Sequence, residues 1–209
     1  MIALGWCRPT CHPPLPMTLR PCGKVAVLCT DFVGAARDRL SWQQQAFDDG
    51  IDLLPLAPGP IWQAEEVCKF TQSAADDLDT KLADLAGQCQ ATLTLHWSAS
   101  VMLCPPDGSG RDWLRKVTRQ HRDTQMQKDR AAELFAKLIT FQPAQQGKLR
   151  YGPSSLSQSL LLARADFADF RHYLQETASA DSGISICLTG PWPAFEFVGA
   201  PLSHSEVLA

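Results

Sequence analysis

The chain has 209 residues, of which 45% are hydrophobic and 20% are charged, a balance typical of an ordinary soluble globular protein. A net charge of −3 and an isoelectric point near 5.9 argue against nucleic acid as the main partner. No apolar run approaches the roughly 20 residues that cross a bilayer. The N-terminal stretch lacks the basic start and the continuous apolar core of a signal peptide. We therefore expect a cytoplasmic protein without membrane insertion.

Residues 1–60 are expected to form a first, small α+β domain. The apolar run 1–6 predicts a strand, the proline-rich stretch 7–23 a loop, and the β-branched run 24–30 a buried strand. The spacing of apolar residues predicts a helix over 32–50, and the run 51–57 predicts a third strand. Residues 61–90 then predict a helical connection, with Leu78, Leu82 and Leu85 on one helix face.

Residues 91–209 are expected to form the second domain. The segment 91–97 alternates apolar and polar residues, as in a half-buried strand. The segments that follow predict a helix from Arg111 to about Phe141, a loop over 142–154, a strand over 155–163, a helix over 166–178 and a strand over 184–190. This order predicts an α+β protein of two small sheet-plus-helix domains, the C-terminal one ferredoxin-like.

The best candidate for a metal site is a cluster in the proline-rich stretch, formed by Cys7, Cys11, His12 and Cys22. Zinc sites usually take their ligands from two separated pairs, whereas this stretch has one pair, an adjacent histidine and a lone fourth cysteine. We therefore expect no metal and no cofactor. A metal-binding regulator or small enzyme that uses this cluster is the alternative function.

No pattern in the sequence indicates catalysis. There is no G-x-S-x-G motif that would place a serine nucleophile on a turn. None of the histidines at positions 96, 121, 172 and 204 has an evident partner group that would orient it for proton transfer. We expect that the protein is not an enzyme.

A positive stripe is expected on the long helix. The segment 111–130 holds seven of the nineteen basic residues of the chain against three acidic ones. On a helix, Arg111, Arg115, Arg119 and Arg122 recur every three or four positions and share a face. This stripe is either a docking face for an acidic partner surface or a solvated helix face. No aromatic stacking platform accompanies it, which argues against RNA binding.

The stretch LTGPWPAFEFV, residues 188–198, predicts a strand, a rigid extended corner and a further strand, because Pro191 and Pro193 exclude a helix. A stiff corner holds Trp192 in one place. Either Trp192 fills a core at the joint between the two domains, or Trp192 and Phe195 offer apolar anchors to a partner at little entropic cost.

This stretch resembles the signature that closes the gas vesicle protein F/L family (GvpL/GvpF), T-G-P-[WL]-P-P-[YF]-x-F-V. The matching residues are Thr189, Gly190, Pro191, Trp192, Pro193, Phe195, Phe197 and Val198, with Ala194 where the family more often has a second proline. A second block, residues 53–67, is similar to a "VLP-hydrophobic-RFGT" segment of the family. It keeps Leu54, Pro55, Leu56 and Gly59 but lacks the arginine, so no role of that arginine carries over.

The resemblance implies a non-catalytic accessory protein of gas vesicle assembly. Such a protein would have two α+β domains, the second ferredoxin-like, and would bind the small hydrophobic shell protein during nucleation or wall formation, or other gas vesicle accessory proteins. It would be cytoplasmic and associated with gas vesicles, and the resemblance implies no catalytic residue. The expected partner-binding residues are Arg111, Arg115, Arg119, Arg122, Trp192 and Phe195.

Overall fold

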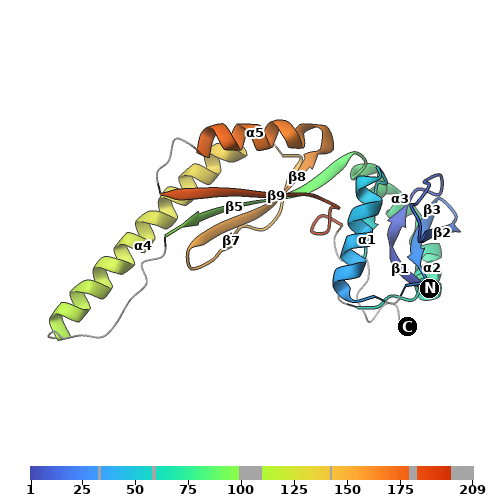
Figure 1. Ribbon diagram of the computed structural model, residues 1–209, viewed down its shortest axis with the longest axis horizontal. Coiled ribbons are helices and arrows are strands. Elements are labelled where there is room, and N and C mark those ends of the chain that lie inside the picture. Colours follow the sequence, from blue (N-terminus) through green and yellow to red (C-terminus); the bar gives the residue numbers. More distant parts are fainter. Residues whose placement is uncertain (33, 58–59, 99–109, 142, 179–182, 199–209) are drawn as a thin grey trace. The chain divides into compact units, whose positions relative to one another are not determined.

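A computed structural model describes residues 1–32, 34–57, 60–98, 110–141, 143–178 and 183–198 (Figure 1). The chain divides into two compact units. Unit 1 comprises Met1–Gln90, Leu161–Ala165 and the stretch from Gly190 onward, and unit 2 comprises Ala91–Leu160 and Asp166–Thr189. The stretch 61–90, expected to connect two domains, is thus part of unit 1, and so is the closing signature from Gly190 onward.

Unit 1 contains a four-stranded sheet of order β2-β3-β1-β4, in which the pairs are antiparallel. Its strands are β1 (Ile2–Cys7), β2 (Met17–Cys22), β3 (Val25–Thr30) and β4 (Leu54–Pro55). The prediction of a loop over 7–23 is wrong for β2, which pairs with β3 over its whole length. Local composition does not reveal β2 because cross-strand pairing with its neighbour stabilises it. The predicted strand 51–57 is reduced to the two residues of β4.

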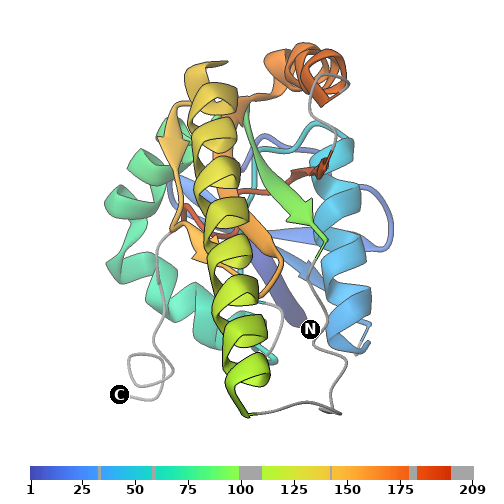
Figure 2. The ribbon, with the colours of Figure 1, turned by 90° about the vertical axis from the view of Figure 1, so that its left-hand side faces the viewer.

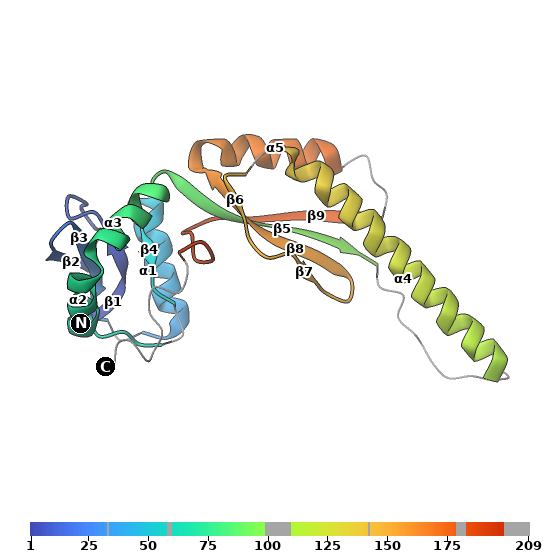
Figure 3. The same ribbon diagram turned by 180° about the vertical axis from the view of Figure 1, so that it is seen from behind.

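Both faces of this sheet are covered by helices (Figures 1 and 3). α1 (Ala36–Asp48) packs on the face that presents Leu4 and Cys7. α2 (Ala64–Ser73) and α3 (Ala75–Asp84) pack on the face that presents Ala3 and Trp6. A bulge between Ala3 and Gly5 shifts the register of β1, so the residues of one face are three positions apart. Because both faces are covered, β1 and β3 are buried along their whole length.

Buried polar side chains tie the helices of unit 1 to its sheet. Gln43 of α1 donates through Nε2 to the main-chain carbonyls of Leu4, at 2.6 Å, and Leu56, at 2.8 Å. Trp6 donates from its indole Nε1 to Oγ1 of Thr71 on α2, at 2.7 Å. These bonds satisfy the buried amide nitrogen of Gln43 and the buried indole nitrogen of Trp6.

The short stretch Leu161–Ala165 is held in unit 1 by Arg164 and Leu161. The guanidinium of Arg164 lies 3.8 Å from the ring centroid of Phe47 and 3.7 Å from a carboxylate oxygen of Asp52. Leu161 is buried in the same cluster as Trp6. Residues far apart in the sequence therefore complete the core of unit 1.

The second sheet lies mostly in unit 2. It has the order β6-β8-β5-β9, with β7 also paired to β8. Its strands are β5 (Gln88–Trp97), β6 (Gln145–Gln146), β7 (Arg150–Tyr151), β8 (Ser155–Ala163) and β9 (Ile184–Trp192). The loop predicted over 142–154 therefore contains two short strands. The order β9-β5-β8, with short strands beyond β8, is compatible with the expected ferredoxin-like arrangement.

This second sheet buries one face only. On β5, Leu93 and Leu95 are buried while His96 on the opposite face is exposed, as the alternating pattern predicts. On β9, Ser185, Cys187 and Thr189 are exposed. Along β5 and β9 this open face is rich in hydroxyl groups, and on β7 it carries the exposed Arg150, which lies opposite Ser157 of β8.

The helices of unit 2 are α4 (Gly110–Leu138), continued by a 3₁₀ turn at Ile139–Phe141, and α5 (Phe167–Ala178), which follows a 3₁₀ turn at Arg164–Asp166. The ring of Phe141 lies 4.9 Å from that of Phe170 on α5, measured between centroids. Of the 29 residues of α4, only Ala131, Phe135 and Leu138 are buried. Figures 1 and 3 show the N-terminal part of α4 running past the ends of β5 and β9.

Candidate partner-binding surfaces

The closing signature folds as a strand end followed by a turn. β9 continues through Gly190, Pro191 and Trp192, and residues 195–197 form a turn in which the amides of Phe197 and Val198 donate to the carbonyl of Ala194, at 3.0 and 3.2 Å. The expectation of a further strand after the corner is therefore wrong, because Ala194 and Val198 turn inward and are buried in the core of unit 1.

Three hydrogen bonds hold this segment within unit 1. Gln44 of α1 donates to the carbonyl of Pro191 at 3.0 Å. The amide of Glu196 donates to Oε1 of Gln90 at 2.9 Å, and Lys81 of α3 donates to the carbonyl of Val198 at 3.2 Å. The signature thus has a structural role in unit 1, since its main chain is bonded to three different elements.

Gly190 has a φ of 122°, a conformation that L side chains rarely adopt. This accounts for a glycine at the start of the corner. The other residues of the signature that the family resemblance singles out are Thr189, which is exposed, Pro193, which is buried, and Phe197, which is half-buried against the core.

Trp192 is the large side chain of the signature that stays accessible. It is 40% exposed, whereas Trp6 is 0%, Trp62 5% and Trp97 5% exposed. Phe195 is half-buried. Trp192 and Phe195 therefore offer apolar surface on unit 1.

The second block of the resemblance lies at the edge of the first sheet. Leu54 and Pro55 form β4 and are buried, and they pair with Trp6 and Gly5 of β1. A side chain at Gly5 would collide with the carbonyl of Leu54, so the close approach of β4 requires a glycine there. Gly59 lies outside the described residues.

The four arginines of the predicted stripe are all exposed on α4. At 100° per residue, Arg111, Arg115, Arg119 and Arg122 fall within an arc of roughly 80°. That arc is opposite the face that carries Ala131, Phe135 and Leu138. In Figure 2, where α4 is nearest to the viewer, no described helix or strand lies in front of it. The stripe is therefore a continuous basic surface, and Arg115 within it forms an ion pair with Asp112, at 3.7 Å.

The same part of α4 also carries exposed apolar side chains, which the charge pattern does not predict. Trp113, Leu114 and Met126 are 40%, 57% and 63% exposed. Trp113 is five helical turns from Ala131, about 27 Å along the axis, and in phase with it. Periodicity alone would place Trp113 against the sheet, but the sheet does not reach that far. The exposure of Trp113 could have been predicted by combining its helical phase with the short length of the strands.

The cysteine and histidine cluster of the alternative function does not assemble. Cys7 lies with Cys11 on the α1 face of the first sheet, whereas Cys22 packs with Cys68 on the opposite face. Burial, and secondarily the neighbouring Cys11, raises the pKa of Cys7 to about 12. Burial and Cys68 raise the pKa of Cys22 to about 11. These thiols are protonated at neutral pH and are poor ligands. No group of three or more His, Cys, Asp or Glu residues within the described parts of the chain could hold a metal ion. The alternative function that used this cluster is therefore not supported.

The hollows in unit 2 bring no catalytic pair together. A cavity of about 280 Å³ between α4 and the end of β5 has Asp123 as the one ionisable group in its described lining. A second hollow, of about 430 Å³, is lined by His96 and Ser185, but the hydroxyl of Ser185 donates to the main-chain carbonyl of His96 and not to its imidazole. That geometry does not activate a serine nucleophile.

No helix among the described residues is both long enough and apolar enough to cross a bilayer. α4 has the length, but its charged residues exclude that role.

The structure is that of an α+β protein with two units, whose notable exposed features are a basic helix, an apolar corner and an open sheet face. Two solved structures share this fold. The gas vesicle protein GvpF from Anabaena sp. PCC7120 is 14% identical, with a TM-score of 0.73 over 97% of each chain. GvpF from Microcystis aeruginosa is 11% identical, with a TM-score of 0.69 over 94% of this chain and 98% of that one. No curated protein sequence matches the chain.

The model of the family described as gas vesicle synthesis protein GvpL/GvpF matches residues 42–199. The chain therefore belongs to the GvpL/GvpF family of gas vesicle proteins.

Proposed function

We propose that this protein is a non-catalytic accessory protein of gas vesicle assembly, which binds the small hydrophobic shell protein during nucleation or wall formation. The observation that carries the proposal is the family match over residues 42–199, a range that contains both α4 and the closing signature. On this proposal the protein works in the cytoplasm, associated with gas vesicles, and requires no cofactor.

The surfaces described above suit such a partner. A subunit that polymerises into a gas-tight wall exposes apolar surface before assembly, and such surface is prone to aggregate. A protein that covers this subunit needs apolar anchors surrounded by a charged rim. On α4, Leu114 and Met126 provide apolar area beside the arginine stripe, and Trp113 provides apolar area on the opposite side of the helix. On unit 1, Trp192 and Phe195 provide a second surface, which is tested separately.

The role in assembly is tested by deleting the gene in a vesicle-forming host and imaging the cells by electron microscopy. We expect vesicles to be lost or greatly reduced, and to return when the full chain is supplied in trans. A normal number of vesicles in the deletion strain would contradict the proposal.

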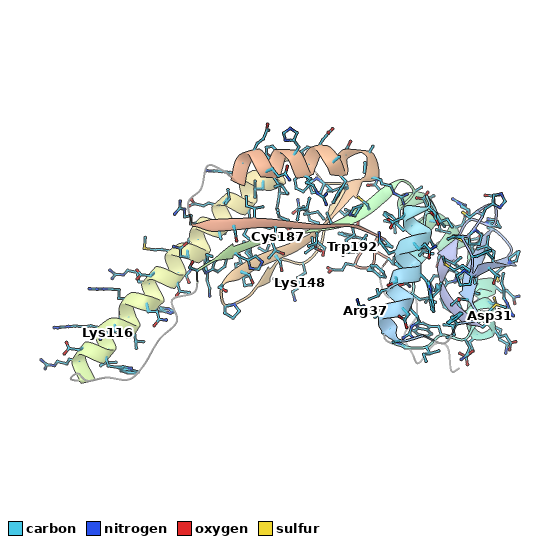
Figure 4. The ribbon with its side chains drawn as sticks, in the orientation of Figure 1. Asp31, Arg37, Lys116, Lys148, Cys187 and Trp192 are labelled. Carbon is cyan, nitrogen blue, oxygen red and sulfur yellow. The ribbon has the colours of Figure 1, made fainter. Side chains whose placement is uncertain are left out.

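Binding to the shell protein is tested by pull-down with the full chain. Replacement of Arg115, Arg119 and Arg122 by glutamate should abolish capture if the stripe is the docking face, because charge complementarity governs such association. Lys148→Glu is the matched control, since Lys148 is exposed and lies outside α4 (Figure 4). Trp192→Ala tests the corner. Unchanged capture by both the stripe variant and Trp192→Ala would show that neither surface binds the shell protein.

A further inference from the structure

β9 is an edge strand without the protection that the other sheet edges have. Its one neighbour in the second sheet is β5. From Ile184 to Thr189 it contains no charged residue and no proline, and every second residue is exposed. An edge that is long, uncharged and accessible offers unpaired amide and carbonyl groups to another strand.

The other edges of the two sheets are protected in the ways that natural sheets use. β4, β6 and β7 have two residues each. β2 contains Arg20 and Pro21, and a proline removes a donor from the edge. Lys148 and Arg150 flank the short strands beside β8. Among the described strands, β9 alone combines length with absence of charge, so its edge is the one open to pairing.

We propose that β9 pairs with β9 of a second copy of this chain, antiparallel and about a two-fold axis at Cys187, so that the two second sheets become one continuous sheet. This inference does not depend on the proposed role in gas vesicle assembly.

The sequence of β9 is complementary to itself in this register. Ile186 lies opposite Leu188 of the second copy, and Ser185 lies opposite Thr189 of the second copy. Apolar residues thus face apolar ones on the covered side of the sheet, and hydroxyl groups face hydroxyl groups on the open side. The axis places the two Cys187 side chains directly opposite each other. Two-fold pairing of identical surfaces is the commonest way in which soluble chains associate.

A second copy fits better than a charged partner strand, because the edge offers no charge to complement. Pairing ends where Gly190 departs from strand geometry, with its φ of 122°, and where Pro191 has no amide to donate. With the axis at Cys187, the five residues from 185 to 189 are therefore the length of edge that a second copy can use.

Cys187 provides a direct test, since it is a free and exposed thiol (Figure 4). We expect the reduced full-length protein to sediment as a concentration-dependent dimer. A short thiol-reactive cross-linker should join two copies through Cys187, as peptide mapping would show, and Cys187→Ser should lose that product.

Charged substitutions at Cys187, on the proposed two-fold axis, distinguish pairing of the β9 edges from other modes of association. Cys187→Glu should weaken the dimer about tenfold or more, because like charges directly opposite each other destabilise paired strands. A mixture of Cys187→Glu and Cys187→Lys should associate more tightly than either variant alone. Ser157→Glu is the matched control, because it places the same charge on the open face of β8, opposite Arg150 and away from the edge.

The inference is overturned if the wild-type protein is monomeric from micromolar to sub-millimolar concentration. It is also overturned if Cys187→Glu associates like the wild type, or if Ser157→Glu disrupts the dimer equally, which would mean that the open faces and not the edges meet. Circular dichroism of each variant confirms that the fold is intact. The assembly proposal is unaffected by these results, since its own readout is vesicle formation.

Discussion

The two sheets of this protein differ in how much of each is hidden. The first has helices on both faces, and β1 and β3 are buried at every residue. The second is covered on one face, and β9 alternates buried or half-buried residues with exposed ones. A sheet covered on both faces has no open face for a partner, whereas a half-covered sheet keeps one face available in addition to its edges. We therefore expect the first sheet to stabilise unit 1, and on the proposed function we expect the binding surfaces on unit 2 and at the corner.

The largest expected difference is between the effects of alanine substitution at Trp6 and at Trp113 on the free energy of unfolding. Trp6→Ala removes a fully buried indole and its bond to Thr71, and should lower the free energy of unfolding by roughly 3–5 kcal/mol. Trp113→Ala removes an indole that is 40% exposed on α4, and should change the free energy of unfolding by less than about 0.5 kcal/mol. Urea unfolding followed by circular dichroism measures both. Similar losses in the two variants would contradict the view that α4 projects without packing.

A second test compares two neighbouring glutamines of α1. Gln43→Leu removes the side-chain donor to the buried carbonyl of Leu56 and leaves the carbonyl of Leu4 with the amide of Leu56 as its donor, and should cost roughly 1–3 kcal/mol. Gln44→Leu removes a bond to Pro191 near solvent, where water replaces the donor, and should cost about 1 kcal/mol or less. The same unfolding experiment ranks the two. An equal or larger loss for Gln44→Leu would place the critical bonds at the signature instead.

Alanine substitution of Gly190, at the corner of unit 1, and of Gly110, at the start of α4, should change the stability of the protein in opposite directions. Gly190→Ala forces a side chain into a φ of 122° and should destabilise the protein by roughly 1–3 kcal/mol. Gly110→Ala, at the start of α4 with no atom within 4 Å of an added Cβ, should leave stability unchanged or raise it by up to about 1 kcal/mol. Melting temperatures of both variants check this. A stable Gly190→Ala protein would show that the corner tolerates other backbone conformations.

The smallest expected effect is the contribution of the buried Cys29 thiol to the pH dependence of stability. Burial, then Cys68, raises the pKa of Cys29 to about 12, from an ordinary value of 9.0. Since the folded state holds the proton more tightly, this stabilisation is complete below pH 9 and is lost as the pH rises toward 12. Cys29→Ala should therefore flatten the alkaline decline of stability. At neutral pH, a thiol reagent should label exposed Cys187 readily and Cys29 only after unfolding. Rapid labelling of Cys29 in the folded protein would contradict its burial.

Much of the element order follows from sequence patterns, for physical reasons that also explain the exceptions. The alternation of β5 and the apolar face of α3 are local signals, and Leu93, Leu95, Leu78 and Leu82 are buried as predicted. β2 is not visible locally, because prolines and polar residues are tolerated at an edge and pairing with β3 supplies the order. The turn at 195–197 mimics a strand in sequence, but its apolar residues are buried through tertiary contacts in unit 1.

The candidate surfaces were partly predictable. The arginine stripe follows from helical periodicity, and its exposure agrees with the solvated face that either interpretation requires. The exposure of Trp113 depends on where the strands end, which periodicity cannot supply. The cluster of the alternative function is not brought together, because proximity in sequence does not determine which side of a strand a side chain occupies, and Cys7 and Cys22 lie on opposite faces.

The discontinuous make-up of unit 1 has a consequence for biosynthesis. Leu161, Ala194 and Val198 are buried in the same cluster as Trp6 and Val27. When residues 1–90 of a nascent chain have emerged from the ribosome, the core of unit 1 therefore still lacks these three side chains. Nearly all of unit 2 must be synthesised before this core can be completed. During that interval the apolar interior of unit 1 is accessible to chaperones, and a product cut short before Gly190 would keep it so permanently.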